Sequence, residues 1–137
     1  MSGSRCKVLS KFDAQALDYI DEVGLSALAH ERAASLPYGR KRALEIATTL
    51  ALSPDMLLLD EPMAGMGRED VELISRLIQR IAENRTVLMV EHNLSVVADL
   101  SDRITVLARG EILAEGTYAE ISKAPEVIEA YIGASHD

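Results

Sequence analysis

Two short, unbroken apolar runs stand out in the pattern of hydrophobic and polar positions along the chain. Residues 56–59 are all Met or Leu, and residues 86–90 are aliphatic apart from Thr86. Turn-forming residues bound both runs, which keeps them too short for buried helices and favours strands. Because neither run alternates with polar residues, each is predicted to be buried on both faces of a parallel sheet.

Helical periodicity accounts for most of the remaining chain. Apolar residues recur every three or four positions over residues 69–82, which predicts an amphipathic helix joining the two strands in a parallel crossover. Residues 1–12 are polar and are expected to be irregular, so the predicted domain spans residues 13–137. Further helices are expected at residues 13–23, 25–30, 37–51, 94–100, 117–122 and 125–132, and a hairpin at residues 104–116 that turns at Arg109-Gly110.

Both predicted strands lead directly into polar residues. Asp60 and Glu61 follow the first run, and Glu91 and His92 follow the second. Ligands of open α/β sheets bind at the carboxyl ends of the strands, so Asp60, Glu61 and His92 are expected to share one edge of the sheet. Taken alone, an Asp-Glu pair in this position is equally consistent with a helix cap or a solvent-facing turn.

A glycine marks the start of the long helix at residues 37–51. Ser35 or the loop itself is expected to supply the capping groups. A glycine here allows another molecule to approach free backbone N–H groups, and the helix dipole favours an anion. When this stretch is considered alone, an ordinary loop-to-helix junction is the favoured interpretation. Its residues are Leu36, Pro37, Tyr38, Gly39 and Arg40.

Composition narrows the class of protein. The 137 residues are enough for one domain, and 48% hydrophobic with only 4% aromatic residues indicates an aliphatic core. A net charge of -8 argues against a nucleic-acid surface. Cys6 is the single cysteine, which rules out an intramolecular disulfide and indicates a reducing compartment. No apolar run approaches the ~20 residues of a membrane span.

Taken in order, these motifs resemble the ATP-binding subunit of ABC transporters. Residues 36–40 resemble the signature loop, residues 56–61 the Walker B strand with its catalytic glutamate, residues 64–67 the D-loop, and His92 the switch histidine. The Tyr-Gly form of the signature, residues 64–66 and residues 125–133 are most similar to the branched-chain amino-acid uptake branch, and the urea and amide uptake branch is the next most similar. The implied fold class is α/β, a partial P-loop NTPase-like ABC nucleotide-binding domain with a signature helix, parallel strands with crossover helices, and a C-terminal hairpin and helices.

The sequence departs from the family pattern in several places. Arg40 stands where glutamine is usual, and Gly67 stands where the D-loop normally ends in Asp or Asn. No G-x-x-x-x-G-K-[ST] phosphate loop is present, so the Walker A half is absent, and the glutamine loop has no clear match. The resemblance therefore covers the C-terminal half of the usual subunit.

The resemblance implies ATP and Mg²⁺ as cofactors. Asp60 would hold Mg²⁺, because a hard cation prefers carboxylate oxygen. Glu61 would orient or deprotonate the attacking water, and His92 would hydrogen-bond the γ-phosphate. Residues 36–40, with Gly39 at the helix start, would bind a nucleotide held by a second subunit. Because a phosphate loop supplies most phosphate contacts, the isolated chain is expected to bind ATP weakly and to hydrolyse it negligibly.

The resemblance also implies partners. An importer subunit of this kind would pair with membrane permease subunits and with a second ATP-binding subunit, and would lie on the cytoplasmic, inner face of the cell membrane. It would not bind nucleic acid. Lacking the strands that complete the sheet, the chain is expected to leave one edge and one face of its core bare and to self-associate.

Two other functions remain open on this evidence. A half-domain could offer residues 36–40 to a complete partner subunit and hydrolyse nothing itself. An ABC-type ATPase of DNA repair is a weaker alternative, because such proteins carry long coiled-coil insertions and basic surfaces, and neither is present here.

Overall fold

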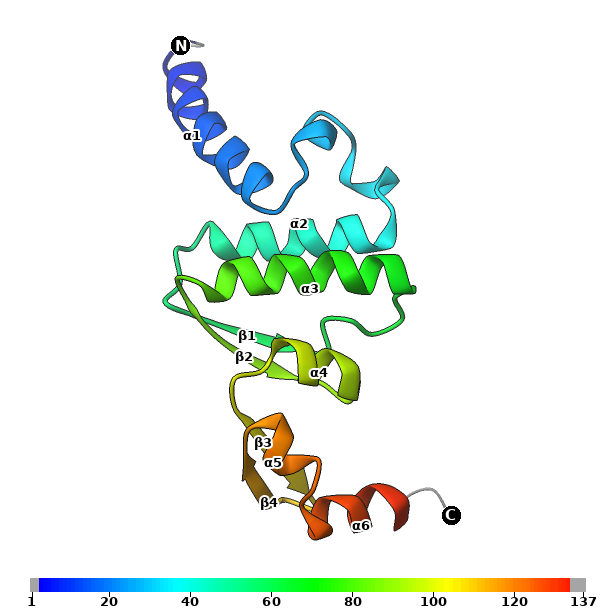
Figure 1. Cartoon of the computed structure of the whole chain (residues 1–137). Helices are drawn as coiled ribbons and strands as arrows, with labels where there is room; N and C mark the ends of the chain where they lie inside the picture. Colours follow the sequence, from blue (N-terminus) through cyan, green and yellow to red (C-terminus); the bar gives the residue numbers. More distant parts are fainter. Residues whose placement is uncertain (1–2, 134–137) are drawn as a thin grey trace. The chain divides into compact units, whose positions relative to one another are not determined.

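The two apolar runs pair as parallel strands in the computed structural model of the chain, which describes residues 3–133 and the side chains of residues 12–130 (Figure 1). β1 (Met56–Asp60) and β2 (Thr86–Val90) are hydrogen-bonded in register along their whole length. α3 (Arg68–Ala82) connects them, which confirms the predicted parallel crossover.

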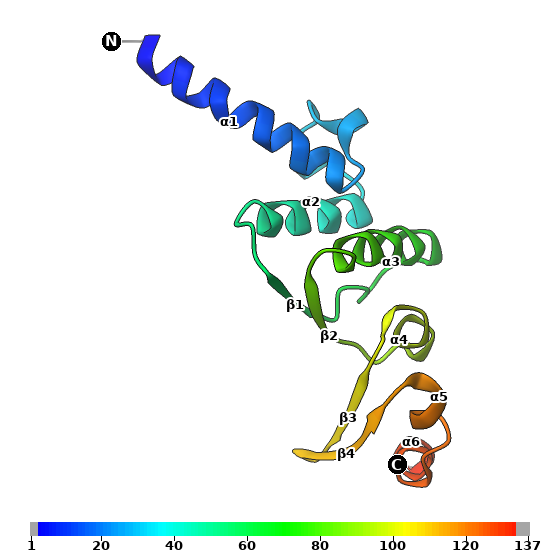
Figure 2. The same cartoon turned by 60° about the vertical axis from the view of Figure 1, so that its left-hand side comes forward.

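The prediction of strands buried on both faces is wrong. Alternate residues of both strands are exposed, and on the other face β1 buries Leu57 whereas Val87 and Met89 of β2 are only partly buried. Leu57 is 1% exposed, whereas its neighbour Leu58 is 71% exposed. The helices α2 (Tyr38–Leu50) and α3 lie on the same side of the strand pair in both views (Figures 1 and 2). A strand pair has two faces, and these helices cover the one that carries Leu57. The expected bare face is confirmed.

Small side chains on α2 allow α3 to pack closely against it. Gly39, Ala43 and Ala47 follow one another at intervals of four residues and are all buried. This spacing places them in a single stripe on one face of the helix. The facing side of α3 contributes larger aliphatic side chains, which are also buried: Ile74, Leu77, Ile78 and Ile81.

The first helix is longer than the sequence pattern predicts. α1 (Gly3–Glu22) begins at Gly3, so the expected irregular segment is helical from that residue onward, and residues 1–2 lie outside the described part. No Gly or Pro interrupts the chain between Gly3 and Gly24, so nothing stops the helix from continuing past its apolar stretch. A 2.9 Å ion pair from Arg85 to Glu22 fixes the end of α1 beside the α3–β2 turn.

Two short 3-10 helices, η1 (Ser26–Leu28) and η2 (Ala33–Ser35), connect α1 to α2. The residues up to Val90 form one compact unit, and the residues from Glu91 onward form a second. Within the described residues, no helix combines the length and the apolar character needed to cross a bilayer.

The second unit contains the predicted hairpin and helices. The hairpin turns at Arg109 and Gly110, whose φ angles of 53° and 82° match the left-handed turns that suit antiparallel strands. Asn93 caps the first helix by accepting hydrogen bonds from the N–H groups of Ser95 and Val96. The elements are α4 (Leu94–Leu100), β3 (Ile104–Ala108), β4 (Glu111–Gly116), α5 (Tyr118–Ile121) and α6 (Pro125–Gly133).

Candidate functional site

The two adjacent carboxylates lie where β1 ends. Asp60 is aligned with Val90 at the end of β2, and the N–H of Glu61 donates to the Val90 carbonyl at 2.9 Å. Glu61 has a φ of 43°, which lies in the left-handed region. This conformation costs a residue other than glycine about 1–2 kcal/mol. The chain therefore turns sharply at the second carboxylate, and both residues are exposed to solvent.

Buried neighbours anchor this carboxylate turn, which comprises residues 60–64. Pro62 and Met63 are both buried, and the N–H of Ala64 donates to the Glu61 carbonyl at 3.0 Å. The exposed acidic residues are thus flanked on one side by a hydrogen-bonded strand and on the other by packed apolar side chains.

The start of α2 differs from the expectation at its cap. Of the two expected sources of capping groups, Ser35 and the loop itself, Ser35 does not cap α2, and its hydroxyl instead donates to the Arg32 carbonyl at 2.7 Å. Pro37 occupies the N-cap position, and its ring carries no hydrogen-bond acceptor. The first turn of α2 therefore receives no side-chain hydrogen bond from its N-cap residue.

Two hydrogen bonds join the first turns of α2 to the carboxylate turn. The Tyr38 hydroxyl donates to the Ala64 carbonyl at 3.3 Å, and Arg42 donates from Nη2 to the Asp60 carbonyl at 3.4 Å. Arg42 also forms a 2.8 Å ion pair with Glu45 on its own helix. Arg42 is partly buried.

Gly39 contacts α3 at the same end of α2. A Cβ built on this glycine would lie 2.9 Å from Asp70 Cβ and still closer to the Asp70 carboxyl group. Only a residue without a side chain fits at that distance. Asp70 belongs to the first turn of α3, so its carboxylate lies near the N-terminal ends of two helices, where negative charge is favourable.

The other residues of the signature stretch differ in exposure. Leu36 is buried, Pro37 and Tyr38 are exposed, and Arg40 is partly buried. A buried aliphatic side chain acts through packing, so Leu36 shapes the loop rather than presenting its side chain to a ligand. Pro37 and Tyr38 are the accessible part of this stretch.

His92 belongs to the second unit, two residues beyond the end of β2. It is exposed, and its backbone N–H donates to Glu91 Oε2 at 3.2 Å. The expectation that His92 shares an edge with Asp60 and Glu61 stays a prediction.

The carboxylates of Asp60 and Glu61 could contribute to a metal site that a ligand completes. Within the described residues, no group of three or more His, Cys, Asp or Glu side chains could hold an ion by itself. Asp60 and Glu61 supply exposed carboxylate oxygens, and Mg²⁺ commonly takes one or two protein carboxylates with the rest of its shell from water and substrate phosphates. The residues therefore fit a magnesium ion that arrives with a nucleotide.

Sequence reasoning missed two residues that hold this site together. Arg42 was predictable in part, because it lies one helical turn after Tyr38 and so shares its face of α2. Asp70 carried no such signal, since its contact with Gly39 depends on how α2 and α3 pack.

Comparison with known proteins identifies the family. The ABC transporter family model matches residues 3–64, and the model for branched-chain amino acid ATP-binding cassette transporters matches residues 111–137. The high-affinity branched-chain amino acid transport ATP-binding protein LivG of Salmonella typhimurium is 39% identical over 121 residues, which cover 87% of this chain and 48% of LivG. The chain belongs to the ABC transporter ATP-binding family.

Other relatives of this ABC chain agree. The corresponding protein BraF of Pseudomonas aeruginosa is 39% identical over 120 residues, covering 86% of the chain and 47% of BraF. A solved ATP-binding cassette in its ADP conformation superposes with a TM-score of 0.78 at 31% identity, covering 86% of this chain and 48% of that one. A nucleotide-free cassette gives 0.75 at 30% identity, with coverages of 88% and 49%. The α/β ABC fold class is confirmed, and the chain spans about half the length of the curated relatives it matches.

Proposed function

We propose that this chain works as part of the ATP-binding subunit of an importer of branched-chain amino acids. One observation carries the proposal: Tyr38 and Arg42 bond the start of the signature helix to the carboxylate turn. The two surfaces that the resemblance assigns to nucleotides are thereby held together within one compact unit. The names of LivG and BraF support the branched-chain branch.

The exposed carboxylates would carry the hydrolytic chemistry. Mg²⁺, when bound with ATP, neutralises phosphate charge. Asp60 would hold that ion directly or through water, since its oxygens are hard ligands. Glu61 would accept a hydrogen bond from the attacking water and orient it in line with the γ-phosphate.

The start of α2 would bind phosphate presented by another subunit. Its first turn lacks a side-chain cap from Pro37, and its dipole favours an anion. Gly39 keeps α3 close without placing a side chain in the way. Tyr38 and Arg40 would flank that phosphate. As a separate role that the resemblance implies, His92 would hydrogen-bond a γ-phosphate.

Partners complete this proposal. The sequence contains no phosphate-loop motif, so the contacts to the β- and γ-phosphates would come from another segment or chain. A second ATP-binding subunit would face the start of α2. Permease subunits would hold the assembly at the inner face of the membrane and would determine the transported solute.

The test mixes the chain with a separate polypeptide that carries the phosphate-loop half of a LivG-type subunit. We expect magnesium-dependent ATP hydrolysis in the mixture, negligible hydrolysis by the chain alone, and loss of activity with Asp60→Asn or Glu61→Gln. Asp55→Asn is the matched control, because Asp55 is an exposed acid just before β1. No hydrolysis, or hydrolysis that survives Glu61→Gln, contradicts the proposal.

A second candidate is a half-domain that offers its signature face to a complete subunit. The exposed, uncapped start of α2 favours it. Pro37→Asp would supply a good helix cap while placing negative charge where a phosphate would bind, and Pro37→Asn would supply a neutral cap. This candidate predicts that the chain stimulates a complete subunit's ATPase, that Pro37→Asp removes the stimulation, and that Pro37→Asn and Glu61→Gln preserve it.

A further inference from the structure

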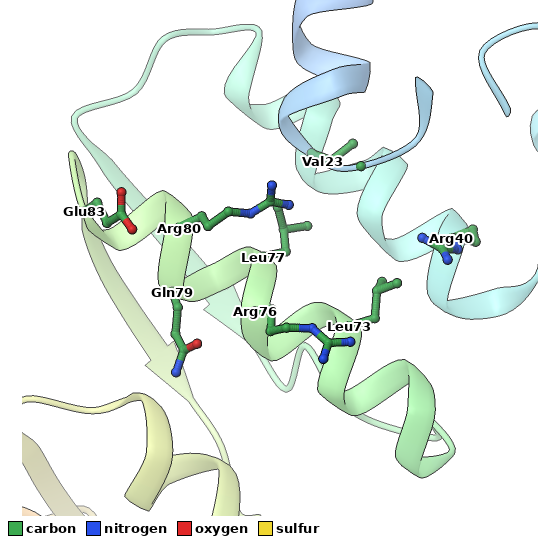
Figure 3. Close-up of a pocket in the computed structure, with 9 residues that line it drawn as sticks. Val23, Arg40, Leu73, Arg76, Leu77, Gln79, Arg80 and Glu83 are labelled. Atoms are coloured by element: carbon green, nitrogen blue, oxygen red, sulfur yellow. The ribbon is translucent and has the colours of Figure 1, made fainter. Parts of the chain in front are cut away.

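An open pocket of about 480 Å³ lies between α3 and the segments that precede it in the first unit (Figure 3). Its floor is aliphatic. Val23 and Leu77 are buried, and Leu73 is partly exposed to the opening. Because Val23 and Leu77 expose almost no surface, Leu73 is the apolar side chain that an aliphatic side chain of a ligand could contact.

Three guanidinium groups border this floor, and we call the site the arginine pocket. Arg76 and Arg80 lie one turn apart on α3, and Arg40 contributes from α2 (Figure 3). A Cβ built on Gly24 would lie 3.9 Å from Arg80 Nη2, so this side chain leans across to the turn after α1. The three cations thus approach one opening from two helices.

Within residues 12–130, the three arginines lack a neutralising carboxylate partner. Among the side chains that the structure describes, no ion pair joins Arg40, Arg76 or Arg80 to a carboxylate. Glu83 is the single acidic residue that lines the pocket. Like charges one turn apart destabilise a helix by about 0.2–0.5 kcal/mol, and a bound anion would relieve that repulsion.

The negative net charge of the whole chain limits which anionic ligands could bind the arginine pocket. The net charge is -8, so a long polyanion or an anionic bilayer would be repelled by most of the surface. A short acidic segment would meet only the local positive field. Guanidinium groups bind carboxylates in bidentate geometry, and the apolar floor adds a contact that a simple anion could not use.

We propose that the arginine pocket binds an acidic, amphipathic segment of a partner protein. One aliphatic side chain of the segment lies on the apolar floor, and neighbouring carboxylates pair with the guanidinium groups. This inference does not depend on ATP hydrolysis, because Arg76 and Arg80 lie outside the residues proposed to contact nucleotide; Arg40 alone is shared with the proposed phosphate-binding stretch.

The probe is a fluorescent synthetic peptide that alternates Leu and Glu, titrated into the full chain and followed by anisotropy. We expect saturable binding that weakens as salt rises, and at least about tenfold weaker binding to Arg76→Gln/Arg80→Gln, since two charge-assisted contacts are lost. Arg68→Gln/Arg103→Gln is the matched control, because it makes the same charge change at two well-exposed positions. The control is expected to bind within about twofold of the parent, in line with the small effect of exposed charges.

Two further measurements separate this pocket from general charge effects. A peptide with Lys in place of Glu is expected to bind Arg76→Glu/Arg80→Glu and not the parent chain, a reversal that unfolding cannot produce. Leu73→Ala is expected to weaken the Leu-Glu peptide and to leave a Ser-Glu peptide unchanged. Equal weakening by the control variant, or equal binding of a Leu-Gln peptide, overturns the proposal. Displacement of the peptide by inorganic phosphate, an RNA oligonucleotide or phosphatidylserine vesicles at lower concentration than the peptide itself also overturns it.

Discussion

Gly39 and Asp70 meet where the first turns of α2 and α3 pack together. A Cβ on Gly39 would lie 2.9 Å from Asp70 Cβ, which is closer than packed carbon atoms approach. This close approach limits how near α2 and α3 can lie at their first turns. The carboxylate of Asp70 also lies near the amino ends of both helices, where its charge is favourable.

Gly39→Ala is expected to destabilise the first unit. Overpacking of this kind costs about 1–3 kcal/mol. The better helix propensity of alanine returns roughly 1 kcal/mol. The net loss should therefore be about 1 kcal/mol, measured as a lower midpoint in urea unfolding followed by circular dichroism.

The double variant Gly39→Ala/Asp70→Ala is the control for that prediction. Asp70→Ala alone removes a favourable helix-end charge and should cost about 0.3–1 kcal/mol. Combined with Gly39→Ala it also removes the obstructing carboxyl group. The double variant should therefore lose less stability than the sum of the losses measured for the two single variants. A loss equal to that sum would show that Gly39 and Asp70 do not interact.

Arg42→Leu is expected to loosen the connection between α2 and the carboxylate turn. The lost hydrogen bond to the Asp60 carbonyl is long and solvent-accessible, so the cost should be about 0.5–1 kcal/mol. Amide hydrogen exchange at residues 60–64 should rise more than exchange in the middle of α3. Glu45→Gln removes the exposed ion pair alone and should change stability by less than about 0.5 kcal/mol. If Arg42→Leu and Glu45→Gln lowered stability equally, the contribution of Arg42 would come from its ion pair with Glu45 and not from its hydrogen bond to Asp60.

The sequence predicted local structure better than it predicted packing. The runs that became β1 and β2, the amphipathic α3 and the Arg109-Gly110 turn were all recognisable, because each depends on residues close in sequence. The burial of the strands was mispredicted for a different reason. An apolar run shows that a strand can be covered on both faces, whereas Leu57 and Leu58 differ because α2 and α3 cover only one.

The candidate site follows the same division. Asp60, Glu61 and Gly39 were recognisable as motif residues. The contacts that hold them, from Tyr38, Arg42 and Asp70, depend on tertiary packing that no spacing rule encodes. The capping prediction failed at Ser35, because a hydroxyl can bond to the preceding 3-10 turn as readily as to the helix that follows.

Glu120 makes the second unit sensitive to acid. The backbone N–H and the hydroxyl of Thr117 donate to its carboxylate at 2.8 and 2.9 Å, and these bonds hold the pKa of Glu120 below its ordinary value. Arg103 lowers the pKa further, while desolvation opposes both effects. Because the folded-state pKa is the lower one, the stabilisation is complete above the ordinary value of 4.5 and is lost as pH falls through the folded pKa.

Hydrogen exchange and carboxyl chemical shifts measured by NMR from neutral pH to below 4.5 would test this dependence. Protection of α5 should fall in the acidic part of that range. Glu120→Gln should lower protection at neutral pH and flatten the acid-dependent change. Glu129→Gln is the control, since Glu129 is exposed on α6, and it should preserve the parent profile. If Glu120→Gln kept the parent's pH dependence of protection, the Glu120 carboxylate would not be the cause of the acid sensitivity.

The bare face of the β1–β2 pair should drive self-association. Leu58 is 71% exposed and Leu88 is 56% exposed, on neighbouring strands of a sheet that has two strands within the described residues. Adjacent exposed aliphatic side chains and unpaired strand edges favour contact with another copy. Light scattering at increasing concentration should show species larger than a monomer, and Leu58→Lys/Leu88→Lys should reduce them by placing charge on the face. Leu107 and Ile112 form a comparable exposed aliphatic pair on the β3–β4 hairpin, so Leu107→Lys/Ile112→Lys tests that pair as the alternative contact and should reduce association less. A monomer at every concentration, or dissociation by the hairpin variant alone, would exclude the strand face as the contact.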